Sequence, residues 1–277
     1  MIRLTKQKKA QIIALSAAAC VGAGYLYAVA PGKSRLDQRA PFRGRYFAHR
    51  GLYDDNARPE NSLAAFRAAA ECGYGAELDV RLTADDVVVI SHDSDLSRMT
   101  GRDVVLEEKS FDQLQLLRLN GTEERIPRLT DALDILCKAK APVIVELKSC
   151  PRWKELCRRT LRILDARDGD FCIESFDPRI VAWFRRHAPE MLRGILTAQR
   201  EHLGASPVQS FLSSRVLYNW YCRPQFIAHR VGRLSAPVRM AQFLGAMRVA
   251  WTARDRGEEA HNDAVIFERF LPPVHYR

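Results

Sequence analysis

The segment AHRGLYDDNARPENSLAAFRAAAECGYGAELDVRLTADDVVVISHDSDLSRMTG, residues 48–101, decides the fold class of this chain. It joins the end of a short apolar run at 45–49 to two further apolar runs at 76–80 and 87–91. Between the first and second runs, residues 60–73 repeat apolar side chains on one face of a helix and end in a glycine. A strand followed by a helix and another strand predicts parallel strands joined by crossover helices.

The same alternation continues to the end of the chain. We predict nine strands, at 45–49, 76–80, 87–91, 142–148, 171–176, 192–197, 225–229, 248–253 and 264–268. We predict helices at 60–73, 110–119, 129–139, 153–166 and 177–188.

Nine strands are one more than a closed barrel of the TIM type needs. The connection 81–86 is too short for a parallel crossover, which takes about a dozen residues or more. One of the strands at 76–80 and 87–91 is therefore expected to form a hairpin beside the barrel. The sequence predicts an α/β fold with a TIM-type (β/α)8 barrel over residues 45–277.

The N-terminal segment differs in composition from the rest of the chain. It contains a long stretch without a charged side chain, and a helix needs about 20 apolar residues to cross a bilayer. We predict that residues 1–32 are an N-terminal membrane anchor, with a transmembrane helix at about 11–30, and that residues 33–44 are a linker.

A cleaved signal peptide is the alternative interpretation of this segment. Ala28-Val29-Ala30 has the small residues typical of a cleavage site. Pro31 would follow the scissile bond directly, however, and the apolar stretch is longer than the about 7–15 residues usual for a signal core. The anchor is therefore the favoured interpretation.

The net charge of +10 is unevenly distributed. Residues 1–45 hold nine basic side chains and one acidic side chain, which leaves only +2 for the rest of the chain. Basic residues beside an apolar segment suit anionic lipid head groups, and no motif typical of nucleic-acid binding is present. We expect a single-pass membrane protein that does not bind nucleic acid. Basic residues on both sides of the apolar stretch leave its orientation open, and the oligomeric state is open as well.

Polar residues gather where the predicted strands end, which is where barrel enzymes place their active sites. These residues are His49, Arg50, Glu77, Asp79, His92, Glu146 and Lys148. Residues two apart in a strand share a face, so Glu77 and Asp79 point the same way. Three carboxylates at one barrel mouth would repel one another without a cation, and an oxygen-only site suits Mg²⁺ or Ca²⁺. Ordinary buried ion pairs with Arg50, Arg81 or Lys148 are the alternative.

The two histidines and the two cations suggest phosphate chemistry. Imidazole is a natural general acid or base near neutral pH. Cations at the same site would neutralise the charge on non-bridging phosphate oxygens. Each histidine taken alone would more often be structural.

Residues 48–101 also closely resemble the hallmark of the glycerophosphodiester phosphodiesterase family. The family pattern is H-R-G, then P-E-N-[ST]-x-x-A-F, then E-x-D-V, then V-x-x-H-D-x-x-L-x-R-x-T, and every element is present in order. IPRLTDALDIL (126–136), VIVELK (143–148), ESFDP (174–178) and VAWTAR (249–254) match further downstream. The resemblance covers about residues 44–270.

This resemblance implies a role for each residue. His49 and His92 would be the general base and the general acid. The divalent cation, Mg²⁺ or Ca²⁺, would be bound by Glu77, Asp79 and Glu146. The phosphate would be held by Arg50 and Lys148, and Glu60 would lie near the metal or orient His49 and Arg50. Trp251 would line the pocket or contact the glycerol moiety, and an ordinary core aromatic is the equal alternative for it.

The activity that the resemblance implies is metal-dependent hydrolysis of glycerophosphodiesters to glycerol 3-phosphate and an alcohol. A glycerol hydroxyl would attack phosphorus, and water would open the resulting cyclic phosphate. Lysophospholipase D activity or hydrolysis of a glycerol-phosphate polymer on the same fold is the alternative. A non-catalytic membrane-tethered binding module is a third hypothesis, which the intact set of polar residues disfavours.

Three features depart from the family pattern. Glu268 stands in IFERFLPP where the last strand often ends in Asp. Glu174 stands where a small or apolar residue is more usual. Residues 203–247 match weakly. These differences affect the expected choice of leaving group more than the catalytic core.

Overall fold

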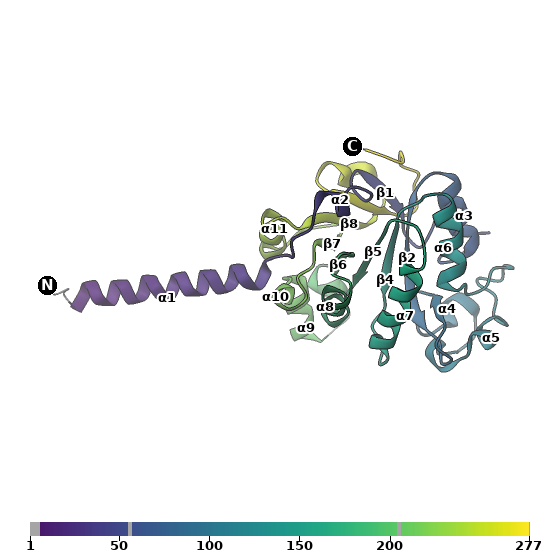
Figure 1. Cartoon of the computed structure of the whole chain (residues 1–277), viewed down its shortest axis with the longest axis horizontal. Coiled ribbons are helices and arrows are strands. Elements are labelled where there is room, and N and C mark those ends of the chain that lie inside the picture. Colours follow the sequence, from purple (N-terminus) through teal and green to yellow (C-terminus); the bar gives the residue numbers. More distant parts are fainter. Residues whose placement is uncertain (1–5, 55–56, 204–205, 277) are drawn as a thin grey trace.

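The computed structural model describes residues 6–54, 57–203 and 206–276, and its strands close into a barrel (Figure 1). The strand order is β1-β9-β8-β7-β6-β5-β4-β2-β3, and a further pairing of β1 with β2 closes the sheet. All neighbours are parallel except β2 and β3. The closed eight-stranded parallel barrel of the TIM type is therefore confirmed.

The strands lie close to the predicted positions. They are β1 (Arg45–Ala48), β2 (Gly75–Leu82), β3 (Val88–Ile90), β4 (Val143–Leu147), β5 (Phe171–Ser175), β6 (Leu192–Thr197), β7 (Phe226–Arg230), β8 (Met247–Ala253) and β9 (Ala264–Phe267). The extra strand is β3, which pairs antiparallel with β2, Leu82 lying opposite Val88. The short connection between these two strands thus forms the expected hairpin.

Most of the helices lie on the outside of the barrel, and the first extends away from it. In the described part of the chain they are α1 (Lys6–Val29), α2 (Leu36–Arg39), α3 (Leu63–Glu71), α4 (Ser97–Thr100), α5 (Phe111–Leu114), α6 (Leu129–Lys138), α7 (Trp153–Asp165), α8 (Pro178–His187), α9 (Pro207–Ser214), α10 (Asn219–Cys222) and α11 (Ala236–Phe243). Single turns of 3₁₀-helix lie at Leu106–Glu108, Arg200–His202 and Arg256–Ala260.

The helix that follows β1 illustrates how local sequence sets these boundaries. The Ser62 side chain accepts a hydrogen bond from the Ala65 amide at 3.2 Å and so caps the first turn of α3. Gly73 has a φ of +79° just past the other end, a conformation that glycine adopts without strain. Helix α5 is shorter than the predicted 110–119, and helices α9, α10 and α11 lie in the weakly matching region, where no helix was predicted.

The barrel interior is packed with side chains from successive strands, among them Phe47, Ile144, Cys172, Leu192, Phe226 and Met247. Large rings need small neighbours in so narrow a space. A Cβ atom on Gly194 would lie 2.0 Å from the Phe226 ring, so the ring occupies the place of a side chain on β6.

Gly194→Ala is accordingly expected to lower the free energy of unfolding by about 2 kcal/mol, because the added methyl group overpacks the interior. Urea denaturation measures the change. Gly24→Ala is the control, because its added Cβ would meet nothing within 4 Å. Equal stability of Gly194→Ala and the wild type would contradict the interior packing described here.

The N-terminal segment forms one helix, α1, which extends away from the barrel (Figure 1). Its end is held by the domain: the Asn219 side-chain amide donates to the Val29 carbonyl at 2.8 Å, and Arg223 donates to the Ala30 carbonyl at 2.9 Å. Within the predicted linker, Phe42 is buried and stacks on Phe47 with ring centroids 6.0 Å apart.

The predicted transmembrane helix at about 11–30 is not supported. No helix among the described residues was found with the length and apolar character that crossing a bilayer requires. The middle of α1, residues 16–24, consists mostly of alanine, glycine and serine, which contribute little apolar surface.

Candidate active site and metal centre

The predicted site residues meet at the C-terminal ends of the strands. A cavity of about 370 Å³ opens there, and its walls include His49, Arg50, Glu77, His92, Glu146, Lys148 and Trp251. A barrel places the ends of all its parallel strands around one opening. Residues that are up to about two hundred positions apart in the chain therefore share one pocket.

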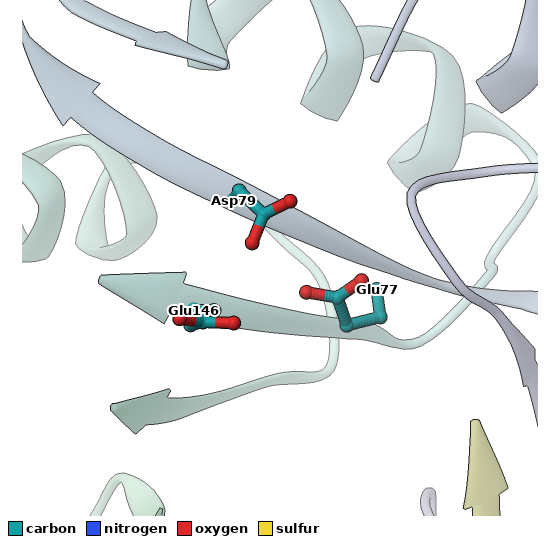
Figure 2. Close-up of side chains that lie close together, drawn as sticks. All are labelled: Glu77, Asp79 and Glu146. Carbon is teal, nitrogen blue, oxygen red and sulfur yellow. The ribbon is translucent and has the colours of Figure 1, made fainter. Parts of the chain in front are cut away.

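Three carboxylates lie close together in this region. Glu77 and Asp79 come from β2, and Glu146 comes from the neighbouring strand β4, where it lies opposite Asp79 in the register (Figure 2). One oxygen from each of the three lies within 4.8 Å of the others, and all three residues are buried. The spacing suits a single cation bound by all three.

The charges within the protein leave part of this cluster uncompensated. Burial raises the pKa of Glu77 well above its ordinary value, and the charges of Asp79 and Glu146 raise it further. Burial also raises the pKa of Glu146. A divalent cation would relieve this repulsion, and carboxylate oxygens are the ligands that Mg²⁺ and Ca²⁺ prefer. Glu77, Asp79 and Glu146 therefore fit a divalent metal.

Two basic side chains border the carboxylates. The Lys148 ammonium lies 2.7 Å from Asp79 Oδ1 and 2.6 Å from Glu146 Oε1. Arg50 Nε lies 3.4 Å from Asp79 Oδ2, and the Arg50 amide donates to Glu77 Oε2 at 3.0 Å. Burial alone would raise the pKa of Asp79, but Lys148 and Arg50 lower it well below its ordinary value. Both cations are thus held beside the proposed metal position.

His49 follows β1 and is oriented by a carboxylate that follows the adjacent strand β9. Its Nδ1 lies 2.8 Å from Glu268 Oε2, so Nδ1–H donates to the carboxylate and Nε2 is left as the free base. Burial lowers the pKa of His49, although Glu268 opposes the shift. Burial alone would raise the pKa of Glu268, but His49 and Arg254 lower it to about 2. A neutral imidazole held by a carboxylate is an arrangement suited to a general base.

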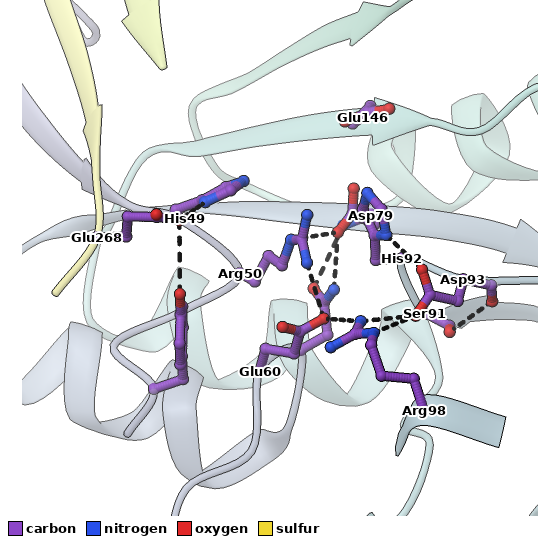
Figure 3. A network of polar contacts seen from close by, with 12 residues as sticks. His49, Arg50, Glu60, Asp79, Ser91, His92, Asp93, Arg98, Glu146 and Glu268 are labelled. Carbon is purple, nitrogen blue, oxygen red and sulfur yellow. Dashed lines mark hydrogen bonds and ion pairs between the residues drawn. The ribbon is translucent and has the colours of Figure 1, made fainter. Parts of the chain in front are cut away.

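His92 is positioned by a chain of charged side chains (Figure 3). Its Nδ1 lies 2.6 Å from Asp93 Oδ1, and Arg98 joins Asp93 to Glu60 with contacts of 2.6 Å to each. Hydrogen bonds from His92 and Arg98 lower the pKa of Asp93.

Glu60 lies at the centre of this chain. Besides Arg98, it accepts a hydrogen bond from Arg50 Nη1 at 2.8 Å. Glu60 therefore contacts Arg50, and not His49, among the residues that it was predicted to orient. Glu60 also links Arg50 to His92, because Arg98 contacts both Glu60 and Asp93 and Asp93 contacts His92.

Trp251 combines the two interpretations that its sequence position left open. It is partly exposed in the cavity wall, and its indole N–H donates to the Thr197 carbonyl at 3.1 Å. Its ring meets Phe176 edge to face with centroids 5.8 Å apart. A fixed aromatic wall of this kind suits the apolar part of a bound substrate.

Several functional side chains were missing from the predicted set. Asn61, at φ +58°, donates to Asp79 Oδ2 at 2.8 Å. Asp93 contacts His92, and Arg98 donates to Asp93. These three lie inside the motifs that the sequence displayed. Glu174 and Glu268 were noted only as departures from the family pattern, yet Glu174 lines the cavity and Glu268 contacts His49.

Comparisons with known proteins show which family this chain belongs to. A glycerophosphodiester phosphodiesterase of Caldanaerobacter subterraneus is 38% identical over 109 residues, which cover 37% of this chain and 44% of that protein. A lysophospholipase D of Rattus norvegicus is 31% identical over 120 residues, which cover 39% of this chain and 37% of that protein. These matches thus span less than half the length of either relative.

A solved structure extends the comparison over most of the barrel. A phosphodiesterase of Oleispira antarctica, solved in complex with the product sn-glycerol-3-phosphate, superposes with a TM-score of 0.69. It is 24% identical, and the superposition covers 83% of this chain and 94% of that one, which shows the shared fold. The sequence model of one family also matches residues 49–270, a span that holds every predicted site residue. This chain belongs to the Glycerophosphoryl diester phosphodiesterase family.

Proposed function

We propose that this protein hydrolyses glycerophosphodiesters to glycerol 3-phosphate and an alcohol, with one divalent cation, Mg²⁺ or Ca²⁺. The observation that carries the proposal is a cluster of three buried carboxylates beside two cations and a carboxylate-bound histidine, at a cavity that Glu77, Glu146, both cations and the histidine line. Each of these groups has a task in phosphodiester hydrolysis, and family membership supports the assignment.

His49 starts the reaction. Its Nε2 accepts the proton of the glycerol 2-hydroxyl, whose oxygen then attacks phosphorus. Glu268 favours the imidazolium that forms, because it accepts a hydrogen bond from Nδ1–H. The low pKa that burial gives His49 keeps the imidazole neutral, and so ready to accept the proton, at neutral pH.

His92 completes the first step as a general acid. Its Nδ1 is engaged by Asp93, so Nε2 is the atom that gives a proton to the departing alcohol oxygen. The bond between phosphorus and that oxygen breaks, which leaves a cyclic phosphate. In the second step His92 accepts a proton from water, the water oxygen opens the ring, and His49 returns its proton to the 2-oxygen.

Arg50 and Lys148 bind the non-bridging phosphate oxygens in this scheme. Glu77, Asp79 and Glu146 would hold the divalent cation, which when bound supplies further positive charge to the phosphate oxygens. Asn61 and Glu60 hold Asp79 and Arg50 in place by hydrogen bonds of 2.8 Å.

The test is a hydrolysis assay with the full chain and a panel of glycerophosphodiesters that carry choline, ethanolamine, inositol or glycerol. Glycerol 3-phosphate is measured as the product. We expect it to form only when Mg²⁺ or Ca²⁺ is present. If none of the substrates yields glycerol 3-phosphate with either cation, the proposal is wrong.

Lysophospholipase D activity is a second candidate, which an adjoining cavity favours. A space of about 510 Å³ shares Ser149, Phe176 and Leu203 with the catalytic cavity. The rest of its wall combines Pro178 and Tyr218 with four polar or charged side chains. An acyl chain on the substrate could lie there. Parallel assays of lysophosphatidylcholine, its deacylated counterpart and a glycerol-phosphate polymer would distinguish these substrates.

The pH profile of kcat/KM should report the state of His49. Activity requires the neutral imidazole, so the acid limb is expected below pH ~6.5, the ordinary pKa of histidine. Glu268→Gln keeps an acceptor for Nδ1–H but removes the charge that favours the imidazolium. The acid limb is therefore expected to move down by about one pH unit.

Tyr53→Phe is the control for this shift, because its hydroxyl lies 3.5 Å from the same Glu268 oxygen but carries no charge. It should leave the limb in place. Movement of the limb to higher pH in Glu268→Gln would contradict the assignment of His49 as the base.

Location at a membrane is a separate part of the proposal and rests on the sequence alone. The basic residues that flank the uncharged N-terminal stretch motivate it. The full chain is expected to sediment with membranes after cell lysis, and a chain that starts at residue 33 is expected to remain in the supernatant. Identical distribution of the two chains would remove this part of the proposal.

A further inference from the structure

One buried carboxyl oxygen in the cavity wall has no hydrogen-bond partner among the residues that the structure describes. Glu174 lies on β5, is 1% exposed and lines the same cavity as His49 and Lys148. Among the described residues, its Oε2 is the one buried carboxylate oxygen without a hydrogen bond. A buried polar group without a partner is costly, so Glu174 requires an explanation.

Three other carboxylates of the site each have a charged partner in the protein. Asp79 contacts Lys148 and Asn61, Glu146 contacts Lys148, and Glu268 contacts His49 and Arg254. On the far side of Glu174 the facing position of β6 is Gly194, which the Phe226 ring covers. The facing position of β6 therefore offers no side chain to Glu174, whereas the cavity that Glu174 lines is open to a bound ligand.

A metal ion bound by the three carboxylates does not supply that partner. Glu174 lies beside Glu146 in the strand register, but the oxygens within 4.8 Å of one another come only from Glu77, Asp79 and Glu146 among the described residues. Glu174 therefore belongs to the wall beside the metal position and not to the ligand set.

The depth of Glu174 indicates which end of the substrate it meets. Two residues further along the strand, Phe176 is 37% exposed and packs against Trp251, so it marks the outer part of the pocket. The leaving alcohol must depart through the outer part. Glu174, at 1% exposure, faces the inner part, where the glycerol end of a glycerophosphodiester would be enclosed.

We propose that Glu174 accepts a hydrogen bond from the terminal hydroxyl of the substrate's glycerol end and so selects phosphodiesters that carry this polyol. This inference rests on the proposed function, in which the 2-hydroxyl faces His49 and the terminal hydroxyl is the donor that remains. A site built around a buried acceptor discriminates strongly against an analogue that lacks the matching hydroxyl.

Calorimetric binding to the full chain with Mg²⁺ tests the proposal without relying on turnover. The ligands are glycerol 3-phosphate, 2-hydroxypropyl phosphate, which lacks the terminal hydroxyl, and inorganic phosphate. The wild type is expected to bind glycerol 3-phosphate about tenfold more tightly than 2-hydroxypropyl phosphate. Glu174→Ala should bind these two ligands equally and should bind inorganic phosphate as the wild type does.

Glu174→Gln and Cys172→Ala complete the design. Glutamine keeps an acceptor oxygen and should retain most of the discrimination. Cys172 is two residues earlier on β5 and packs in the barrel interior, so Cys172→Ala reports any general loosening of the strand and should leave the discrimination intact. If Glu174→Ala does not fold, Glu174→Ser takes its place. The wild-type comparison of glycerol 3-phosphate with 2-hydroxypropyl phosphate does not depend on either variant.

Three results would overturn the inference. The wild type could bind glycerol 3-phosphate and 2-hydroxypropyl phosphate equally, or Glu174→Ala could discriminate between them as the wild type does. The third result is a loss of Mg²⁺ affinity in Glu174→Ala that weakens binding of all three ligands alike. Failure of the proposed function is a different result. It would appear as no hydrolysis of any glycerophosphodiester by the wild type, whatever the variants bind.

Discussion

His49→Ala is expected to lower kcat for glycerophosphodiester hydrolysis by about 10³-fold. The variant removes the imidazole whose Nδ1 is held by Glu268 at 2.8 Å, and with it the free Nε2 that accepts the proton of the attacking hydroxyl. KM should change little, because Arg50 and Lys148 remain to bind the phosphate. Steady-state kinetics with saturating divalent cation measure both constants.

His261→Ala is the matched control, since this exposed histidine lies outside the cavity wall. It should retain wild-type turnover. Imidazole added to the solution should partly restore the turnover of His49→Ala, because the variant leaves space where the histidine side chain stood. Turnover of His49→Ala within a few-fold of the wild type would remove His49 from the mechanism.

Replacement of the three carboxylates is expected to have an equally large effect. Chelation of divalent cations should abolish hydrolysis by the wild type, and added Mg²⁺ or Ca²⁺ should restore it. Glu77→Gln, Asp79→Asn and Glu146→Gln should each lower kcat by about 10³-fold, since the charge that a bound cation supplies to the phosphate amounts to several kcal/mol. Glu123→Gln, at an 88% exposed carboxylate, is the control.

Although Glu77→Gln is expected to lower kcat, it should make the metal-free protein more stable. Burial and the neighbouring carboxylates raise the pKa of Glu77, so its ionised form destabilises the metal-free protein above that pKa. Removal of the charge should therefore raise the Tm without metal, whereas added Mg²⁺ should raise the Tm of the wild type alone. A lower metal-free Tm for Glu77→Gln would show that the carboxylate is satisfied within the protein and needs no cation.

The barrel could be predicted because each strand carries a local signal. The short connection between β2 and β3 even identified the extra strand as a hairpin. Helices α9, α10 and α11 had no such signal, since two of them are eight residues long and the third is four. Packing against the barrel, which no local pattern reports, decides such short helices.

The carboxylates and histidines of the site were predictable for a similar reason, since they lie at strand ends or in contiguous motifs. The role of Glu268 was not, because it depends on the closure of the barrel. Strand β9 pairs with β1 in a register that sets Phe267 opposite Ala48, and only this pairing brings Glu268 beside His49. The importance of Glu174 likewise could not be predicted, because only the three-dimensional structure shows that its buried Oε2 has no hydrogen-bond partner among the described residues.

The most direct test of the account is the location of a divalent cation in crystals of the full chain grown with Mn²⁺ in place of Mg²⁺. Anomalous scattering identifies the ion without reference to activity. The account predicts one peak within coordination distance of oxygens from Glu77, Asp79 and Glu146 together. A peak at another place, or no peak at saturating Mn²⁺, would contradict it.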